Sequence, residues 1–146
     1  MMIMNNSKIF FNAILIGFTA LIYMLSTSFK QDYIQEKIDG KFVYTKNCSV
    51  CHRNNGKGIP HTFPPLYKSD YLKNHSKEEI ISIILKGQKG KLKVNGKIYN
   101  NVMTPFKNLS NEEIAAVLTY ISNNFGNSSA VYLPDEVKKV RESLGK

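Results

Sequence analysis

The 146-residue sequence predicts an all-α domain of three to five helices with a small β-hairpin, preceded by a hydrophobic N-terminal helix. Three observations lead to this fold class. Two Ser-x-x-Glu segments each stand directly before an apolar run, which is the pattern of a capping box at a helix start. An Asn-Gly pair in a short polar segment predicts the turn of a hairpin. Near the N-terminus, 21 consecutive residues carry no charge, which is typical of a membrane-spanning helix.

The uncharged N-terminal run covers residues 9–29. A helix of this length, at about 1.5 Å per residue, would be roughly 32 Å long, enough to cross the apolar core of a bilayer. Its apolar part, residues 9–25, exceeds the ~7–15 residues usual in a cleaved signal peptide. We therefore expect residues 1–29 to be a membrane anchor that holds residues 30–146 on the periplasmic side of the cytoplasmic membrane. The alternative is a cleaved signal peptide and a soluble periplasmic protein.

A Cys-x-x-Cys-His motif, Cys48-Ser49-Val50-Cys51-His52, contains the only two cysteines of the chain. This is the spacing of a haem attachment site. Positions i and i+3 share a helix face, so both thiols can reach the two vinyl groups of one porphyrin. His52, at i+4, projects from the same face toward the iron. The alternative is a thiol redox or zinc site, but zinc takes about four ligands and no second cysteine pair is present.

Two further segments accompany the motif: residues 63–66 read Phe-Pro-Pro-Leu, and residues 103–106 read Met-Thr-Pro-Phe. Together with the motif they resemble a class I c-type cytochrome, of the small bacterial mono-haem kind, over residues 33–143. The resemblance implies a cytochrome c fold wrapped around one haem c, bound covalently through Cys48 and Cys51. It also implies one-electron transfer between respiratory partners and no enzymatic activity.

The first helix of the exported part is predicted over residues 33–51, leading into the motif. Gly40 and Tyr44 lie eight and four residues before the first cysteine. In the family, a small residue and an aromatic at these spacings let the last helix cross closely, so we expect Val117 and Tyr120 to contact them. A glycine inside a helix costs about 1 kcal/mol relative to alanine, which favours a packing role. The alternative is that Gly40 breaks the helix, which would then start one residue later.

The two prolines after the motif are expected to orient the ligating histidine. The second ring nitrogen of a metal-bound histidine needs an acceptor, and a proline keeps its carbonyl. In the family a proline carbonyl of this loop serves His52. We assign that role to Pro64, with Pro65 as the alternative, and expect Leu66 to pack on the porphyrin.

Local signals predict the remaining elements of the domain. Capping boxes start two helices, a glycine follows each of them, and Asn-Gly forms a hairpin turn. In chain order these are the capping box 76–79 with the apolar run 80–85 and Gly87, the turn 94–97, the capping box 110–113 with a helix to Phe125 and Gly126, and a short helix near 134–143.

The second axial ligand is expected to be Met103, since the other four methionines belong to residues 1–29. Its segment resembles the ligand loop of small bacterial cytochromes c, where a methionine precedes a proline-rich turn. Tyr99 and Phe106 are then expected to wall the pocket. Thr104 departs from the pattern, because many relatives have a proline there. This departure could loosen the loop or the iron–sulfur bond.

Three alternatives to ligation by Met103 remain open. A methionine is more commonly a gap-filling core residue. His61 and His75 are rival ligands, although each has the sequence context of an ordinary exposed histidine. A small ligand such as peroxide or nitric oxide could also displace Met103 in an enzyme or sensor.

The exported part is strongly basic: 19 of the 20 Lys and Arg and all 11 acidic residues lie in residues 30–146, which therefore carry +8. A segment with many lysines is commonly a solvated loop. In an electron carrier they would favour redox partners with acidic docking surfaces, since charge complementarity speeds encounter. No interleaving of aromatic and basic residues suggests nucleic-acid binding, and two filled axial positions leave no place for a small-molecule substrate. Five of the lysines lie within twelve residues: Lys86, Lys89, Lys91, Lys93 and Lys97.

Overall fold

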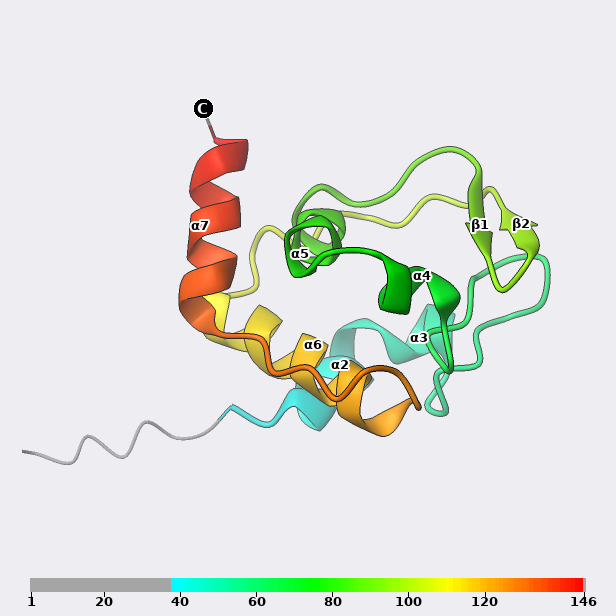
Figure 1. Ribbon diagram of the computed structural model, residues 1–146, viewed down its shortest axis with the longest axis horizontal. Helices are drawn as coiled ribbons and strands as arrows, with labels where there is room; N and C mark the ends of the chain where they lie inside the picture. Colours follow the sequence, from blue (N-terminus) through cyan, green and yellow to red (C-terminus); the bar gives the residue numbers. More distant parts are fainter. Residues whose placement is uncertain (1–37, 146) are drawn as a thin grey trace, which may run out of the picture. The chain divides into compact units, whose positions relative to one another are not determined.

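The computed structural model describes residues 38–145 (Figure 1). The predicted membrane helix over residues 9–29 lies outside the described residues, as does the beginning of the helix predicted over 33–51. No helix within the described range is long and apolar enough to span a bilayer.

The two helices predicted from capping boxes, the final helix and the hairpin are confirmed, and one short helix, α4, is additional. Ser69 caps α4 by accepting a hydrogen bond from the Leu72 backbone N–H at 3.4 Å. No sequence pattern predicted this helix, because five residues are too few to show a helical period. The elements are α2 Gly40–Asn47, α3 Ser49–His52, α4 Asp70–Asn74, α5 Lys77–Lys86, β1 Leu92–Val94, β2 Lys97–Tyr99, α6 Asn111–Asn124 and α7 Pro134–Leu144.

Helix α2 is shorter than predicted. Ile38 and Asp39 are not helical, and the Asp39 side chain caps the helix by accepting from the Lys41 N–H at 2.8 Å. Gly40 is therefore the first helical residue, neither a mid-helix position nor a break. The predicted continuous helix into the motif is also wrong, because Cys48 separates α2 from α3.

The close crossing of α2 and α6 is confirmed (Figure 1). A Cβ on Gly40 would overlap the carbonyl oxygen of Ala116 and lie 3.0 Å from the Tyr120 Cβ. The rings of Tyr44 and Tyr120 pack with their centroids 5.6 Å apart. Val117, also expected at this crossing, is buried in the same core. Glycine at position 40 therefore has the packing role that the resemblance implied.

Both predicted capping boxes are formed. Ser76 accepts from the Glu79 N–H at 3.2 Å while the Glu79 carboxylate accepts from the Ser76 N–H at 2.9 Å. Ser110 and Glu113 repeat the arrangement at the start of α6. The capping boxes fix where the two helices begin, and apolar residues of both helices belong to one core. Its most deeply buried members are Val43, Tyr44, Ile81, Leu85, Ile114, Ala115, Val117, Leu118 and Val137.

The hairpin β1–β2 pairs antiparallel across a two-residue turn. Asn95 and Gly96 have φ of 50° and 75°, the left-handed values that an Asn-Gly hairpin turn requires. The turn is fastened to α4, since Asn95 and Asp70 exchange side-chain-to-backbone hydrogen bonds of 2.9 and 2.7 Å. Helix α7 packs on α5 and α6 at the other end of the domain (Figure 1).

Candidate haem site

The motif cysteines sit where α2 ends and α3 begins. Cys48 caps α2, and its carbonyl accepts hydrogen bonds from the N–H groups of Cys51 at 3.2 Å and His52 at 2.9 Å. Both thiols are free, with Cys48 buried and Cys51 partly exposed. Burial raises the pKa of the Cys48 thiol to about 11, and the nearby Cys51 adds to the shift. The single turn of α3 thus brings both sulfurs and the imidazole to one region.

His52 is oriented by Pro64, as expected, and not by Pro65. The Nδ1 atom lies 2.9 Å from the Pro64 carbonyl oxygen. A carbonyl can only accept, so Nδ1 carries the proton and Nε2 keeps its lone pair. Burial lowers the pKa of His52, whereas the bond to Pro64 opposes that shift. The result is a neutral imidazole with a free nitrogen, the form that binds iron.

Gly58 lets the Pro64 loop pack closely under the histidine. Its N–H donates to the His52 carbonyl at 2.9 Å, and its φ is 66°. A Cβ there would overlap the Phe63 carbonyl and lie 2.7 Å from the Pro64 carbonyl oxygen. The position therefore requires glycine for both its backbone angle and its space.

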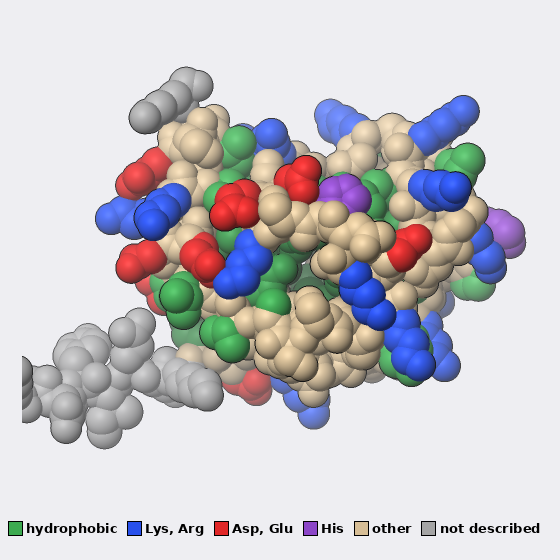
Figure 2. Space-filling model, in the orientation of Figure 1, with side chains coloured by type: hydrophobic (Ala, Val, Ile, Leu, Met, Phe, Trp, Pro, Cys, Tyr) green, Lys and Arg blue, Asp and Glu red, His purple; other side chains and the backbone are tan. Residues whose placement is uncertain are grey.

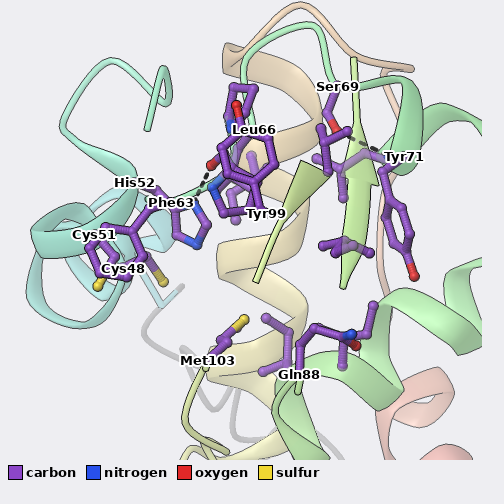
Figure 3. A pocket seen from close by; sticks show the side chains of 18 of the residues that line it. Cys48, Cys51, His52, Phe63, Leu66, Ser69, Tyr71, Gln88, Tyr99 and Met103 are labelled. Carbon is purple, nitrogen blue, oxygen red and sulfur yellow. Dashed lines mark hydrogen bonds between the residues drawn. The ribbon is translucent and has the colours of Figure 1, made fainter. Parts of the chain in front are cut away.

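Met103 belongs to the loop between β2 and α6, and its backbone lies beside Gln88, just after the end of α5. Its backbone N–H and carbonyl pair with Gln88 at 2.9 and 3.0 Å, an isolated β-bridge. Phe106 N–H donates to the Ile84 carbonyl at 2.8 Å. In Figure 3 the Met103 thioether and the His52 ring project into the same space from different walls. Residues more than fifty positions apart therefore form one site.

A mostly apolar cavity of about 440 Å³ lies between these groups (Figure 3). Its walls come from every described element except α7, together with the Pro64 and Met103 loops. Apolar walls with a few convergent polar groups are the usual make-up of a cofactor pocket. All eight residues that the sequence analysis selected line it: Cys48, Cys51, His52, Pro64, Leu66, Tyr99, Met103 and Phe106.

The two rival histidines do not line this cavity. His61 is exposed in the loop that follows the motif. His75 is partly buried, bonds the Tyr71 carbonyl through Nδ1 at 2.8 Å, and stacks on the Tyr71 ring with centroids 3.6 Å apart. Neither imidazole therefore has access to the place where the cofactor would lie.

Several wall residues were missed at the level of sequence. Tyr71 and Leu72 come from α4, which was not predicted, and Ile80 and Ile84 come from the buried face of α5. The only signal for the α5 residues was the helical spacing of their apolar side chains, which does not distinguish a core face from a cavity wall.

Asn127 supports the site from outside it: its Nδ2 donates to the Leu66 carbonyl at 2.9 Å and its Oδ1 accepts from the Ser69 N–H at 3.0 Å.

The basic segment, residues 86–97 with their five lysines, lies beside the cavity. All five of its lysines are exposed, and Leu92, Val94 and Tyr99 of the same hairpin line the cavity. Figure 2 shows Lys and Arg gathered at the hairpin end, and most acidic side chains over α5 and α7. Near the cavity, Val50 and Val102 also expose 76% and 58% of their surface. This face therefore combines positive charge with exposed apolar side chains.

The residues present fit a haem c group. Two thiols, a neutral imidazole with its outer nitrogen bonded, and a thioether surround an apolar cavity. A zinc site would need a cluster of protein ligands. Within residues 38–145, no three His, Cys, Asp or Glu side chains lie close enough together to hold a metal ion.

Comparison with known proteins agrees with this chemistry. The family "Cytochrome c" matches residues 38–125. Cytochrome c-552 of Thermus thermophilus is 40% identical over 111 residues, which cover 70% of this chain and 84% of that protein. The cytochrome c subunit of the quinone alcohol dehydrogenase of Gluconacetobacter polyoxogenes is 29% identical over 109 residues, 73% of this chain and 23% of the subunit.

Proposed function

The chain belongs to the cytochrome c family and is an electron carrier, and we propose that it uses one haem c ligated by His52 and Met103. Cys48 and Cys51 would hold the porphyrin through thioether bonds. When bound, the haem supplies an iron that alternates between the ferric and ferrous states. The observation that carries this proposal is the convergence of all the selected residues on one cavity.

The protein groups around the cavity have distinct tasks in this proposal. Pro64 keeps the proton of His52 on Nδ1, so that Nε2 faces the cavity as a ligand. Met103, as a soft thioether, raises the reduction potential relative to a second imidazole. Tyr99 and Phe106 limit access of water to the iron, and Leu66 packs on the porphyrin. If His52 and Met103 both held the iron, no position on it would be open for a small-molecule substrate.

The visible spectrum of the ferric protein tests the ligation. A methionine–iron bond gives a weak absorption at the red end of the spectrum, and Met103→Ala should abolish it. The substitutions His61→Ala and His75→Ala should leave it in place, because neither side chain lines the cavity. The proposed ligation is wrong if the wild-type band is absent or survives Met103→Ala. Ready binding of carbon monoxide by the reduced protein would instead favour a ligand-binding role.

We also propose that electrons pass between respiratory partners on the outer side of the cytoplasmic membrane. The length of the uncharged run 9–29 supports an anchor at the membrane over a cleaved leader. The same spectrum, taken on membrane and soluble fractions of cells that express the full chain, distinguishes the two. The exposed lysines beside the cavity support partners with acidic docking surfaces.

A further inference from the structure

Helix α7 lies beyond residues 38–125, which the family matches, and one of its side chains reaches back to the loop after Met103. Each nitrogen of the Arg141 guanidinium donates one hydrogen bond there. Nη1 lies 2.8 Å from the Lys107 carbonyl, and Nη2 lies 2.7 Å from the Leu109 carbonyl. Nε lies 2.9 Å from Asn111 Oδ1. One side chain therefore spans residues 107–111, from the end of the Met103 turn to the first residue of α6.

The Met103 loop is held at two ends by different parts of the fold. At its beginning, Met103 pairs with Gln88 and the Phe106 N–H donates to the Ile84 carbonyl, so α5 and the residues just after it fix this end. At its far end, the three bonds from Arg141 tie it to α7. A planar guanidinium suits this task because its donors form a rigid fork, and bonds from a charged donor are stronger than neutral ones.

We infer that Arg141 is a positioning residue for the axial ligand: by clamping residues 107–111 it keeps the Met103 loop closed. The inference rests on the proposed ligation by Met103. An outside ligand can take the place of Met103 only when the loop opens, so its apparent affinity scales with the open fraction. Bonds made only in the closed loop lower that fraction, and losing them raises the affinity of the outside ligand.

The helix that carries Arg141 has other anchors. Val137 and Val140 are buried, and Glu136 forms an ion pair with Lys77 at 2.8 Å. Replacing the guanidinium should therefore free the loop while α7 stays docked. Lys138, exposed on the same helix, provides a control that removes the same charge.

The experiment titrates imidazole into the purified ferric holoprotein and follows loss of the red-end methionine band. We expect Arg141→Gln to bind imidazole about tenfold more tightly, corresponding to about 1.4 kcal/mol less stabilisation of the closed loop. Arg141→Lys should fall between this variant and the wild type, because an ammonium lacks the fork. Lys138→Gln should match the wild type. Amide exchange should quicken at Met103 and Phe106 in Arg141→Gln, and not in α2.

The outcomes separate this inference from the proposed ligation. Absence of the band in the wild type refutes ligation by Met103, and the inference falls with it. If the wild type has the band and Arg141→Gln binds imidazole no more tightly, only the inference fails. An equal gain in Lys138→Gln also overturns it, because charge alone would then explain the effect. If Arg141→Gln does not fold, Arg141→Lys provides the test. Imidazole affinity and amide exchange at Met103 and Phe106 equal to those of the wild type would then refute the inference.

Discussion

Single residues decide how closely the chain approaches itself in this protein. Gly40 allows the backbone of α6 to pack against α2, because any side chain at this position would overlap the Ala116 carbonyl. Tyr44, one turn later, donates its hydroxyl to the Arg53 carbonyl at 2.6 Å and so ties α2 to the loop after the motif. The small and the aromatic residue thus place the helix that leads to Cys48 against the rest of the domain.

Gly40→Ala should destabilise the protein. The added methyl meets backbone, which cannot rotate away, so α2 and α6 must separate at a cost of about 1–3 kcal/mol. Chemical denaturation of the holoprotein, followed by far-UV circular dichroism, measures the loss. Gly145→Ala is the control, since a Cβ there meets only atoms at 3.8 Å or beyond. Equal stability of Gly40→Ala and the wild type would contradict the close crossing.

At the scale of elements, short helices are joined to one another by specific polar contacts. Asn127 links the Leu66 loop to Ser69, and Asp70 links α4 to the hairpin turn. Lys77 at the start of α5 pairs with Glu136 at the start of α7, where the carboxylate also accepts from the Leu133 N–H at 2.8 Å. These contacts set the positions of elements too short to be stable alone.

The ion pair between Lys77 of α5 and Glu136 of α7 should make the free energy of unfolding depend on pH in the acidic range. The hydrogen bond from Lys77, helped by the Leu133 N–H, lowers the pKa of Glu136 below its usual value. A lowered pKa in the folded state contributes stability above the unfolded value of about 4.3, and this is lost as the pH falls through the folded pKa. Both side chains are about one-third exposed, so the contribution is at most about 1 kcal/mol.

Glu136→Gln should therefore be less stable than the wild type at pH 7 and nearly equal to it at pH 3. Urea denaturation at both values measures the difference. Glu142→Gln, exposed on the same helix, serves as the control and should follow the wild type at both. A difference for Glu136→Gln that persists unchanged at pH 3 would show that the charge of Glu136 is not its cause.

At the scale of the whole molecule, charge is unevenly distributed over the described residues 38–145. Residues 80–111 contain six lysines and no acidic residue, and the hairpin among them borders the cavity. The acidic side chains of α5 and α7 lie at the other end (Figure 2). An asymmetric charge of this kind turns a positive face toward an anionic partner before contact.

Oxidation of the reduced holoprotein by hexacyanoferrate(III), an anion, tests this asymmetry. In stopped flow at low salt, Lys93→Glu and Lys97→Glu together should slow the reaction several-fold, and the difference should shrink as salt screens the charges. The control pair, Lys138→Glu with Lys139→Glu on α7, makes the same charge change away from the hairpin. Equal slowing by both pairs would mean that net charge alone acts and that the hairpin face is not preferred.

The chain by itself determined the features that depend on neighbours in sequence. The haem motif, both capping boxes, the Asn-Gly turn and the final helix are local patterns whose physics acts within a few residues. The proposal of Met103 as an iron ligand followed from counting the methionines. The role of Pro64 and the crossing at Gly40 came from a family resemblance, and the structure shows both contacts.

Only the tertiary structure decided the rest. The start of α2 at Gly40 depends on the Asp39 cap, and the wall formed by α4 depends on Ser69, a signal too short to recognise alone. The three hydrogen bonds from Arg141 to residues 107–111 join segments about thirty positions apart. Such contacts form because packing of the core brings distant backbone carbonyls within reach of a donor, and no pattern along one segment of sequence encodes that distance.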